Sequence, residues 1–156
     1  MVAQTRVHLR DGSPATFKAL LALNEQAALL AAEAELDGLL VELIKIRVSQ
    51  LNGCAFCLRM HTRDAVKAGE TPERLAVLPT WRETDYFSAH ERAALELSEA
   101  ITFIAGEHVP DSVYAAAASH LSDAQIAAVS WLAIVMNAFN RVAIASRYVV
   151  GPTPLS

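Results

Sequence analysis

The spacing of hydrophobic positions along the chain predicts an all-helical protein. Apolar side chains recur every three or four residues, which places them on one face of an α-helix, and no segment shows the sustained alternation of a β-strand. Seven segments carry this spacing: 14–35, 38–51, 54–68, 72–78, 88–105, 111–119 and 124–148. Residues 1–13 and 79–87 lack it, so we expect an extended arm and a loop there.

Residues that favour helix ends support these boundaries. Asn52 and Gly53 tolerate the left-handed conformation that terminates helices, so the second and third helices are expected to form a hairpin around them. Capping-box patterns, in which a serine is followed three residues later by Glu or Gln, begin at Ser88 and Ser122. Two of the longer helices therefore have a defined start as well as a periodic interior.

The length and composition of the chain indicate a single domain with a well-filled core. The chain has 156 residues, of which 53% are hydrophobic and 19% charged, and much of the apolar excess is alanine. An alanine-rich, leucine-rich chain of this length with few glycines favours a single-domain helical bundle of six to seven helices over residues 1–156. The high apolar share also indicates surface buried between subunits, because obligate interfaces resemble a protein core.

Charge and hydropathy argue against several kinds of partner. The formal net charge is −4, and the basic residues are scattered singly rather than in a stripe, so we expect no nucleic acid. The longest apolar stretch, from Ile126 to Phe139, is shorter than the roughly 20 residues that span a bilayer, so we expect no membrane. The N-terminal residues lack the apolar core of a secretory signal, which predicts a cytoplasmic protein.

The two cysteines are the strongest indication of chemistry. Cys54 and Cys57 form a C-x-x-C motif, and His61 follows one helical turn after Cys57. Two thiols at this spacing can close a small disulfide, and an imidazole one turn away can accept a thiol proton. In a cytoplasmic chain such a pair points to catalysis, redox sensing or metal binding rather than to a structural disulfide.

A carboxylate on the preceding helix completes the constellation. If the two helices of the hairpin run antiparallel, Glu42 and His61 stand at similar heights on facing helices, because each lies about eight to ten residues from the turn. The spacing permits a line of groups in the order Glu42, His61, Cys57, Cys54. A carboxylate behind an imidazole orients the ring, and the first turn of a helix favours negative charge. We therefore expect acidified thiols.

These motifs resemble the signature of the alkylhydroperoxidase D and carboxymuconolactone decarboxylase superfamily. Glu42, eleven intervening residues, Cys54-x-x-Cys57, three more residues and His61 match that signature in order and spacing. Four segments are similar to sequences of the family: 43–62, 81–83, 88–95 and 137–141. The resemblance covers roughly residues 15–148, which we take as the core of the domain.

The resemblance implies an alkylhydroperoxidase D-like fold, a homo-oligomer such as a trimer or hexamer, and cofactor-free peroxidase activity in antioxidant defence. It implies that Cys57 reacts with peroxide, that Cys54 resolves the product to a disulfide, and that His61 and Glu42 relay protons. The partners would be a hydroperoxide substrate and an external dithiol or protein reductant. The best-studied branch has a histidine where this chain has Phe56, so one proton carrier is missing. The decarboxylase branch generally lacks the cysteine pair, which argues against decarboxylation.

Two other interpretations follow from the same residues. A disulfide that switches the oligomeric state would make the chain a redox-sensing or interaction protein without turnover. Alternatively, Glu42, Cys54, Cys57 and His61 are all zinc-ligand types, so they suit a metal-binding protein. Size measurements on oxidised and reduced protein test the first interpretation, and elemental analysis tests the second.

Three polar residues interrupt the last apolar helix. They are Asn137, Asn140 and Arg141. Polar groups that are buried need hydrogen-bond partners. We expect these residues mainly to tie helices together rather than to line a pocket.

Overall fold

The computed structural model describes residues 6–152, and every regular element in that range is helical. The predicted all-α fold is therefore confirmed. The elements in chain order are α1 (Leu9–Gly12), α2 (Pro14–Glu33), α3 (Gly38–Asn52), α4 (Ala55–Lys67), α5 (Pro72–Val77), the 3₁₀-helix η1 (Leu78–Glu83), α6 (Ala89–Thr102), α7 (Ile104–Glu107), α8 (Asp111–His120) and α9 (Asp123–Ala145).

Three short elements were not predicted. α1 lies in the segment expected to be an extended arm, whose first five residues are outside the described range, and η1 lies in the segment expected to be a loop. α7 is separated from the helix predicted for 88–105, because α6 ends at Thr102. Each of these elements spans only four to six residues, too few to show a hydrophobic period. The predicted count of six to seven helices is therefore too low.

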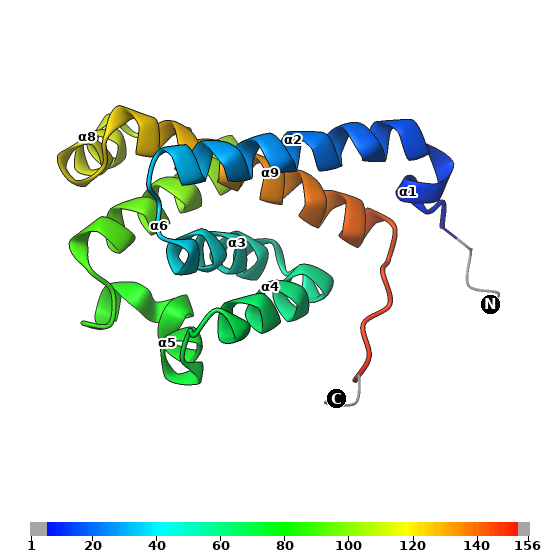
Figure 1. Ribbon diagram of the computed structural model, residues 1–156, viewed down its shortest axis with the longest axis horizontal. Helices are drawn as coiled ribbons and strands as arrows, with labels where there is room; N and C mark the ends of the chain where they lie inside the picture. The colour runs from blue at the N-terminus through cyan, green and yellow to red at the C-terminus, as the bar shows by residue number, and fades with distance from the viewer. Residues whose placement is uncertain (1–5, 153–156) are drawn as a thin grey trace.

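Two long helices and a helical hairpin form the framework of the molecule (Figure 1). α2 runs along one side with α9 beside it, and the hairpin of α3 and α4 lies on the other side. α9 packs against α2, α3 and α6, while α3 also packs against α4 and α6. The segment that follows α9 descends past the turn between α3 and α4 (Figure 1). The residues that follow α9 therefore lie next to the α3–α4 hairpin.

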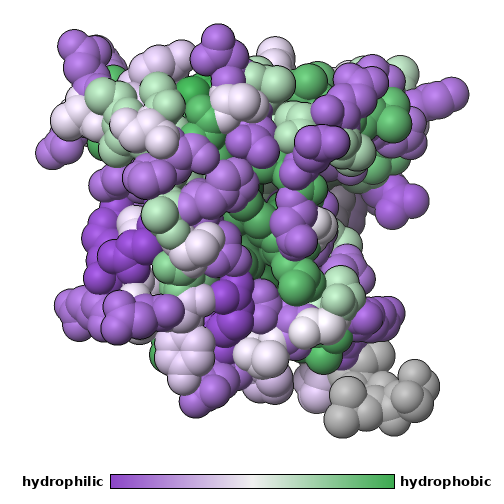
Figure 2. Space-filling model, turned by 60° about the vertical axis from the view of Figure 1, so that its left-hand side comes forward, coloured by the Kyte–Doolittle hydropathy of each residue, from purple (hydrophilic) through white to green (hydrophobic). Residues whose placement is uncertain are grey.

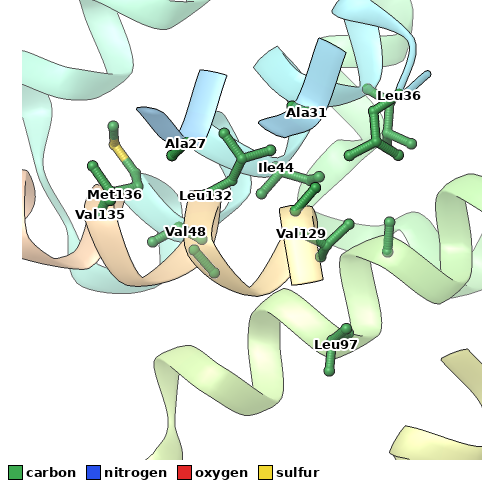
Figure 3. Packing of buried hydrophobic residues seen from close by; sticks show 14 of the residues in the cluster. Ala27, Ala31, Leu36, Ile44, Val48, Leu97, Val129, Leu132, Val135 and Met136 are labelled. Carbon is green, nitrogen blue, oxygen red and sulfur yellow. The ribbon is translucent and has the colours of Figure 1, made fainter. Parts of the chain in front are cut away.

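The core lies where α9 meets α2 and α3. Figure 3 shows Ala27 and Ala31 of α2 close to the side chains of α9, among them Leu132, with Ile44 and Val48 of α3 in the same group of side chains. All of these residues are buried. The small alanine side chains of α2 let its backbone approach α9 closely, so larger residues from α3 and α9 fill the remaining space.

The turn between α3 and α4 sets the geometry of the site. Gly53 adopts the left-handed conformation at φ 67°, and the N–H of Cys54 donates to the carbonyl of Ser49 at 3.0 Å. α3 therefore ends abruptly and α4 starts directly after Cys54, which confirms the predicted hairpin. The capping boxes predicted at Ser88 and Ser122 are both present, at the starts of α6 and α9.

By length and composition, α9 is long and apolar enough to cross a membrane, which the shorter apolar run from Ile126 to Phe139 did not indicate. Within residues 6–152 it is the only such helix. Half of its most apolar 18-residue window is buried inside the molecule. Because the core helix of a globular protein passes the same test, α9 is weak evidence for a membrane span.

Several large apolar side chains nevertheless reach the surface of α2 and α9. They are Leu21, Leu23, Leu29, Trp131, Ile134 and Ile144. The face in Figure 2 is mainly hydrophilic, with hydrophobic side chains gathered in its middle and along its upper edge. Surface of this kind is what subunit contacts would cover. The oligomeric state stays a prediction.

A buried carboxylate joins α6 to α3 and to η1. Glu99 of α6 accepts hydrogen bonds from Nε of Arg47 at 2.6 Å, from Nε1 of Trp81 at 2.7 Å and from Nη1 of Arg82 at 2.6 Å. Burial alone would raise the pKa of Glu99, but the hydrogen bonds from Trp81, Arg82 and Arg47 outweigh it and hold the pKa below its usual value. An ionised carboxylate therefore links α6 to η1 and to α3, the first helix of the hairpin.

Candidate functional site

The α3–α4 hairpin brings Glu42 and His61 into direct contact. Oε2 of Glu42 lies 2.8 Å from Nδ1 of His61, and the other oxygen, Oε1, accepts from Nζ of Lys45 at 2.7 Å. Burial alone would raise the pKa of Glu42, but the hydrogen bonds from His61 and Lys45 outweigh it, so the pKa lies below its ordinary value. Glu42 is therefore a carboxylate at neutral pH.

The charge of Glu42 decides which nitrogen of His61 carries a proton. An ionised carboxylate can only accept hydrogen bonds, so Nδ1 must donate to it. In the neutral ring, Nε2 is then left with a free lone pair. Nε2 is buried and has no hydrogen-bond partner among the described residues. His61 is thus arranged to accept a proton at Nε2.

The two sulfurs lie side by side at the start of α4. Cys54 occupies the position before the first helical residue, and Cys57 lies in the first turn. Both residues are buried, both thiols are free, and the sulfurs are 2.9 Å apart. A disulfide bond is about 2.05 Å long, so closing one here needs only a small movement.

The expectation of acidified thiols is wrong for Cys57. Burial, followed by the hydrogen bond with Cys54, raises the pKa of its thiol from 9.0 to about 12. A hydrogen bond with Asn140 acts in the opposite direction and is outweighed. The start of a helix and a nearby imidazole do favour a thiolate, but the sequence did not show how completely the packing excludes water.

The predicted line of four groups is present as two pairs. Glu42 bonds His61, and Cys54 bonds Cys57, but Nε2 of His61 makes no hydrogen bond to either sulfur. Cys57 and His61 line the same pocket, which has a volume of about 230 Å³. A molecule bound in this space, which we call the thiol pocket, would contact both groups at once.

The thiol pocket is apolar apart from a few groups. Its walls come from α2, α3, α4, α9 and the segment after α9, and they include Phe17, Phe56, Met60, Met136, Phe139 and Val142. Cys57 lines the pocket, whereas Cys54 does not. The two thiols therefore differ in which one an entering molecule meets.

A polar network behind the cysteines was only partly foreseen. Asn52 donates to the side-chain oxygens of Asn137 at 3.0 Å and Asn140 at 2.9 Å, and Asn140 donates to Ser49 at 3.0 Å. Arg141 donates to the side-chain oxygen of Asn137 at 2.8 Å. These contacts join α9 to the turn before the cysteines. The polar interruptions of an apolar helix gave a signal for the network, but nothing in the sequence indicated that Asn140 reaches Cys57.

The residues do not assemble the metal site that we considered. Glu42 and His61 have ligand atoms within 4.8 Å of each other and of Asp64, and neither sulfur belongs to that group. Asp64 is exposed, while Oε1 of Glu42 is already held by Lys45. The described residues therefore separate a carboxylate–imidazole pair from the thiols instead of joining all four ligands around one centre.

The raised pKa predicts slow alkylation of Cys57. At pH 8, we expect iodoacetamide to label Cys57 about a thousandfold more slowly in the folded protein than in the urea-unfolded chain, because the thiolate fraction falls by that factor when the pKa rises from 9.0 to about 12. Fragment mass spectrometry distinguishes Cys57 from Cys54. The folded rate should keep rising above pH 9, and a plateau below pH 9 would contradict the burial argument.

Comparison with known proteins agrees with this geometry. The model of the carboxymuconolactone decarboxylase family matches residues 14–100, which is more than half of the chain. The chain belongs to the carboxymuconolactone decarboxylase family. The matched range contains both cysteines, His61 and Glu42. The superfamily resemblance found in the sequence is therefore confirmed.

Relatives and solved structures extend this result. The uncharacterized protein YdfG of Bacillus subtilis is 50% identical over 104 residues, which cover 67% of this chain and 71% of that protein. The crystal structure of ATU0492 from Agrobacterium tumefaciens, a protein of unknown function named as a candidate antioxidant defence protein AhpD, has a TM-score of 0.84 at 31% identity and covers 98% of this chain and 100% of that one.

A more distant structure shares the fold alone. An uncharacterized peroxidase-related protein from Silicibacter sp. TM1040 has a TM-score of 0.73 at 24% identity, covering 85% of this chain and 68% of that chain. The confirmed all-α fold is thus the AhpD-like one. Membership of the carboxymuconolactone decarboxylase family indicates an enzyme.

Proposed function

We propose that this protein is a thiol-dependent peroxidase that reduces hydroperoxides with its cysteine pair. The observation that carries the proposal is that two free sulfurs lie 2.9 Å apart, one of them in a pocket shared with an imidazole that can accept a proton. Membership of the family and the name given to the similar protein from Agrobacterium tumefaciens support it. No cofactor is needed for the chemistry.

The first step oxidises Cys57. A hydroperoxide ROOH enters the thiol pocket, and the thiol proton of Cys57 passes to Nε2 of His61. The thiolate attacks one peroxide oxygen, so that an S–O bond forms as the O–O bond breaks. The leaving alkoxide takes a proton back from His61, which yields ROH and Cys57 sulfenic acid. Glu42 stabilises the imidazolium that forms in between.

The second step forms the disulfide. The thiol of Cys54 attacks the sulfenic sulfur of Cys57, and the hydroxyl leaves as water. The short separation of the sulfurs supports rapid closure. An external dithiol then reduces the disulfide by thiol–disulfide exchange, which returns both thiols and releases the oxidised reductant.

Stopped-flow mixing of the reduced protein with hydrogen peroxide or cumene hydroperoxide tests the proposal. We expect both thiols to be lost much faster than free cysteine is oxidised, and the intact mass to fall by two hydrogens. If thiol loss is no faster than that of free cysteine, the protein is not a peroxidase. A change in oligomeric size upon oxidation without turnover would instead favour a redox sensor.

Glu42→Gln is expected to slow the peroxide reaction on the order of 10²-fold, because a neutral amide no longer stabilises the imidazolium that takes the thiol proton. Single-turnover thiol loss measures the effect. Glu25→Gln, at an exposed position on α2, is the matched control and should leave the rate unchanged. Equal rates for Glu42→Gln and the unmodified protein would remove Glu42 from the proton relay.

A further inference from the structure

We propose that the hydroxyl of Tyr148 binds the hydroperoxide in the thiol pocket and donates a hydrogen bond to the oxygen that leaves. This inference rests on the proposed peroxidase function and adds a residue to it. Tyr148 lies outside the family-matched range of 14–100. It lines the thiol pocket together with Cys57 and His61.

The hydroxyl of Tyr148 is unusual in its surroundings. Its oxygen is buried and has no hydrogen-bond partner among the described residues. Buried hydroxyls nearly always have a partner, because leaving one unpaired costs free energy. The only other unpartnered buried polar atom from the residues that line the thiol pocket is Nε2 of His61. Tyr148 and His61 both line the pocket, so an unpartnered donor and an unpartnered acceptor belong to residues that a bound hydroperoxide would contact.

The chain holds Tyr148 in place with a strained turn. α9 ends at Ala145, and Arg147 adopts a left-handed conformation at φ 51° although it is not glycine. The N–H of Tyr148 then donates back to the carbonyl of Ala143 at 3.0 Å. This is the arrangement of a Schellman motif, in which a residue beyond the helix folds back over its last turn. Glycine would adopt this left-handed conformation without strain. Because the residue here is Arg147, the surrounding contacts must stabilise the conformation.

Two rings fix the orientation of the tyrosine. His8 stacks on Tyr148 with ring centroids 4.7 Å apart and an interplanar angle of 15°. Phe56 meets the tyrosine ring edge-on, with centroids 5.0 Å apart. Tyr148 is therefore clamped between the segment before α1 and the first turn of α4. A donor held in this way loses little freedom when it binds a ligand.

Other charged groups at the pocket are already occupied. Lys45 lines the pocket but is 2.7 Å from Oε1 of Glu42, and His61 must receive the thiol proton of Cys57. Phe56, between the two cysteines, has no group that can donate a hydrogen bond or transfer a proton. Tyr148 keeps its own proton throughout the step: it donates a hydrogen bond to the RO⁻ oxygen as the O–O bond breaks, and His61 supplies the proton that completes ROH.

The walls of the pocket point to the class of substrate. Apart from Asn24, Lys45, Cys57, His61 and Tyr148, the lining residues are apolar, so burying an aryl or branched alkyl group against them gains free energy that the small, polar hydrogen peroxide does not gain. Tyr148 would then orient the peroxide group while the apolar group occupies the space between α2 and α9.

Single-turnover kinetics of Tyr148→Phe test the inference. We expect the rate constant with cumene hydroperoxide to fall about a hundredfold, as when one donor to a developing oxyanion is removed. The rate of Cys57 alkylation by iodoacetamide should stay unchanged, because the leaving group in that reaction is iodide, which needs no hydrogen bond from the Tyr148 hydroxyl. The melting temperature should not fall, since the hydroxyl removed has no partner. Tyr114→Phe, at an exposed position on α8, is the matched control.

A second readout separates a chemical role from a packing role. With ring-substituted cumene hydroperoxides, the rate should depend more steeply on the pKa of the leaving alcohol in Tyr148→Phe than in the unmodified protein. If Tyr148→Phe reacts as fast as Tyr114→Phe with an equal slope, the inference is wrong and the proposed function stands. If the unmodified protein itself reacts no faster than free cysteine, the proposed function fails and the inference fails with it.

Discussion

Cys57→Ser is expected to reduce the consumption of hydroperoxide to the rate of buffer alone. The hydroxyl of serine ionises far less readily than a thiol and does not attack a peroxide oxygen, and Cys54 is not among the residues that line the thiol pocket. Peroxide loss in the presence of a small dithiol, followed by a colorimetric assay, measures the effect. Full turnover by Cys57→Ser would overturn the assignment of the reacting thiol.

Cys54→Ser is the matched control for this experiment. It keeps the thiol that faces the pocket, so it should react once with hydroperoxide and stop at the sulfenic acid, because no neighbouring thiol can resolve it. Trapping with dimedone and mass spectrometry should then find the adduct on Cys57. If the adduct forms on Cys54 in the reciprocal variant instead, the roles of the two thiols are exchanged.

The helices and their ends could be predicted because they depend on local sequence. The six longer helices follow from a period of three to four residues, the short helix α5 follows from Pro72 at its start, and the starts at Ser88 and Ser122 follow from side chains that bond the backbone three residues on. Gly53 identifies the hairpin for the same reason. The pairing of Glu42 with His61 needed only one further assumption, that two helices joined by a tight turn run antiparallel.

The ionisation state of Cys57 could not be predicted, because it depends on contacts between distant segments. The packing of α9 and of the chain after it closes over the first turn of α4, and the burial that results outweighs the local features that favour a thiolate. The position of Tyr148 at the pocket could not be predicted for a related reason. Only the strained turn at Arg147 brings it to the pocket, and a left-handed arginine has no sequence signal.

The cluster around Glu99 was also invisible in the sequence, although it yields the largest expected effect on stability. Glu99→Ala is expected to lower the free energy of unfolding by about 3–5 kcal/mol, the usual cost of removing one partner from a buried ion pair. The variant leaves the Nε–H of Arg47, whose side chain is 12% exposed, and the indole N–H of Trp81 without their acceptor. Urea denaturation followed by circular dichroism measures the change.

Glu96→Ala provides the comparison that isolates burial. Glu96 pairs with the same arginine, Arg82, at 3.5 Å, but its side chain is 36% exposed against 11% for Glu99. An exposed pair contributes only about 0–1 kcal/mol, so Glu96→Ala should change the free energy of unfolding by no more than that. Similar losses in the two variants would mean that the loss follows from shortening any side chain on α6. A large loss confined to Glu99→Ala would show that the ionised carboxylate holds η1 and α3 to α6, and with them the helix that carries Glu42.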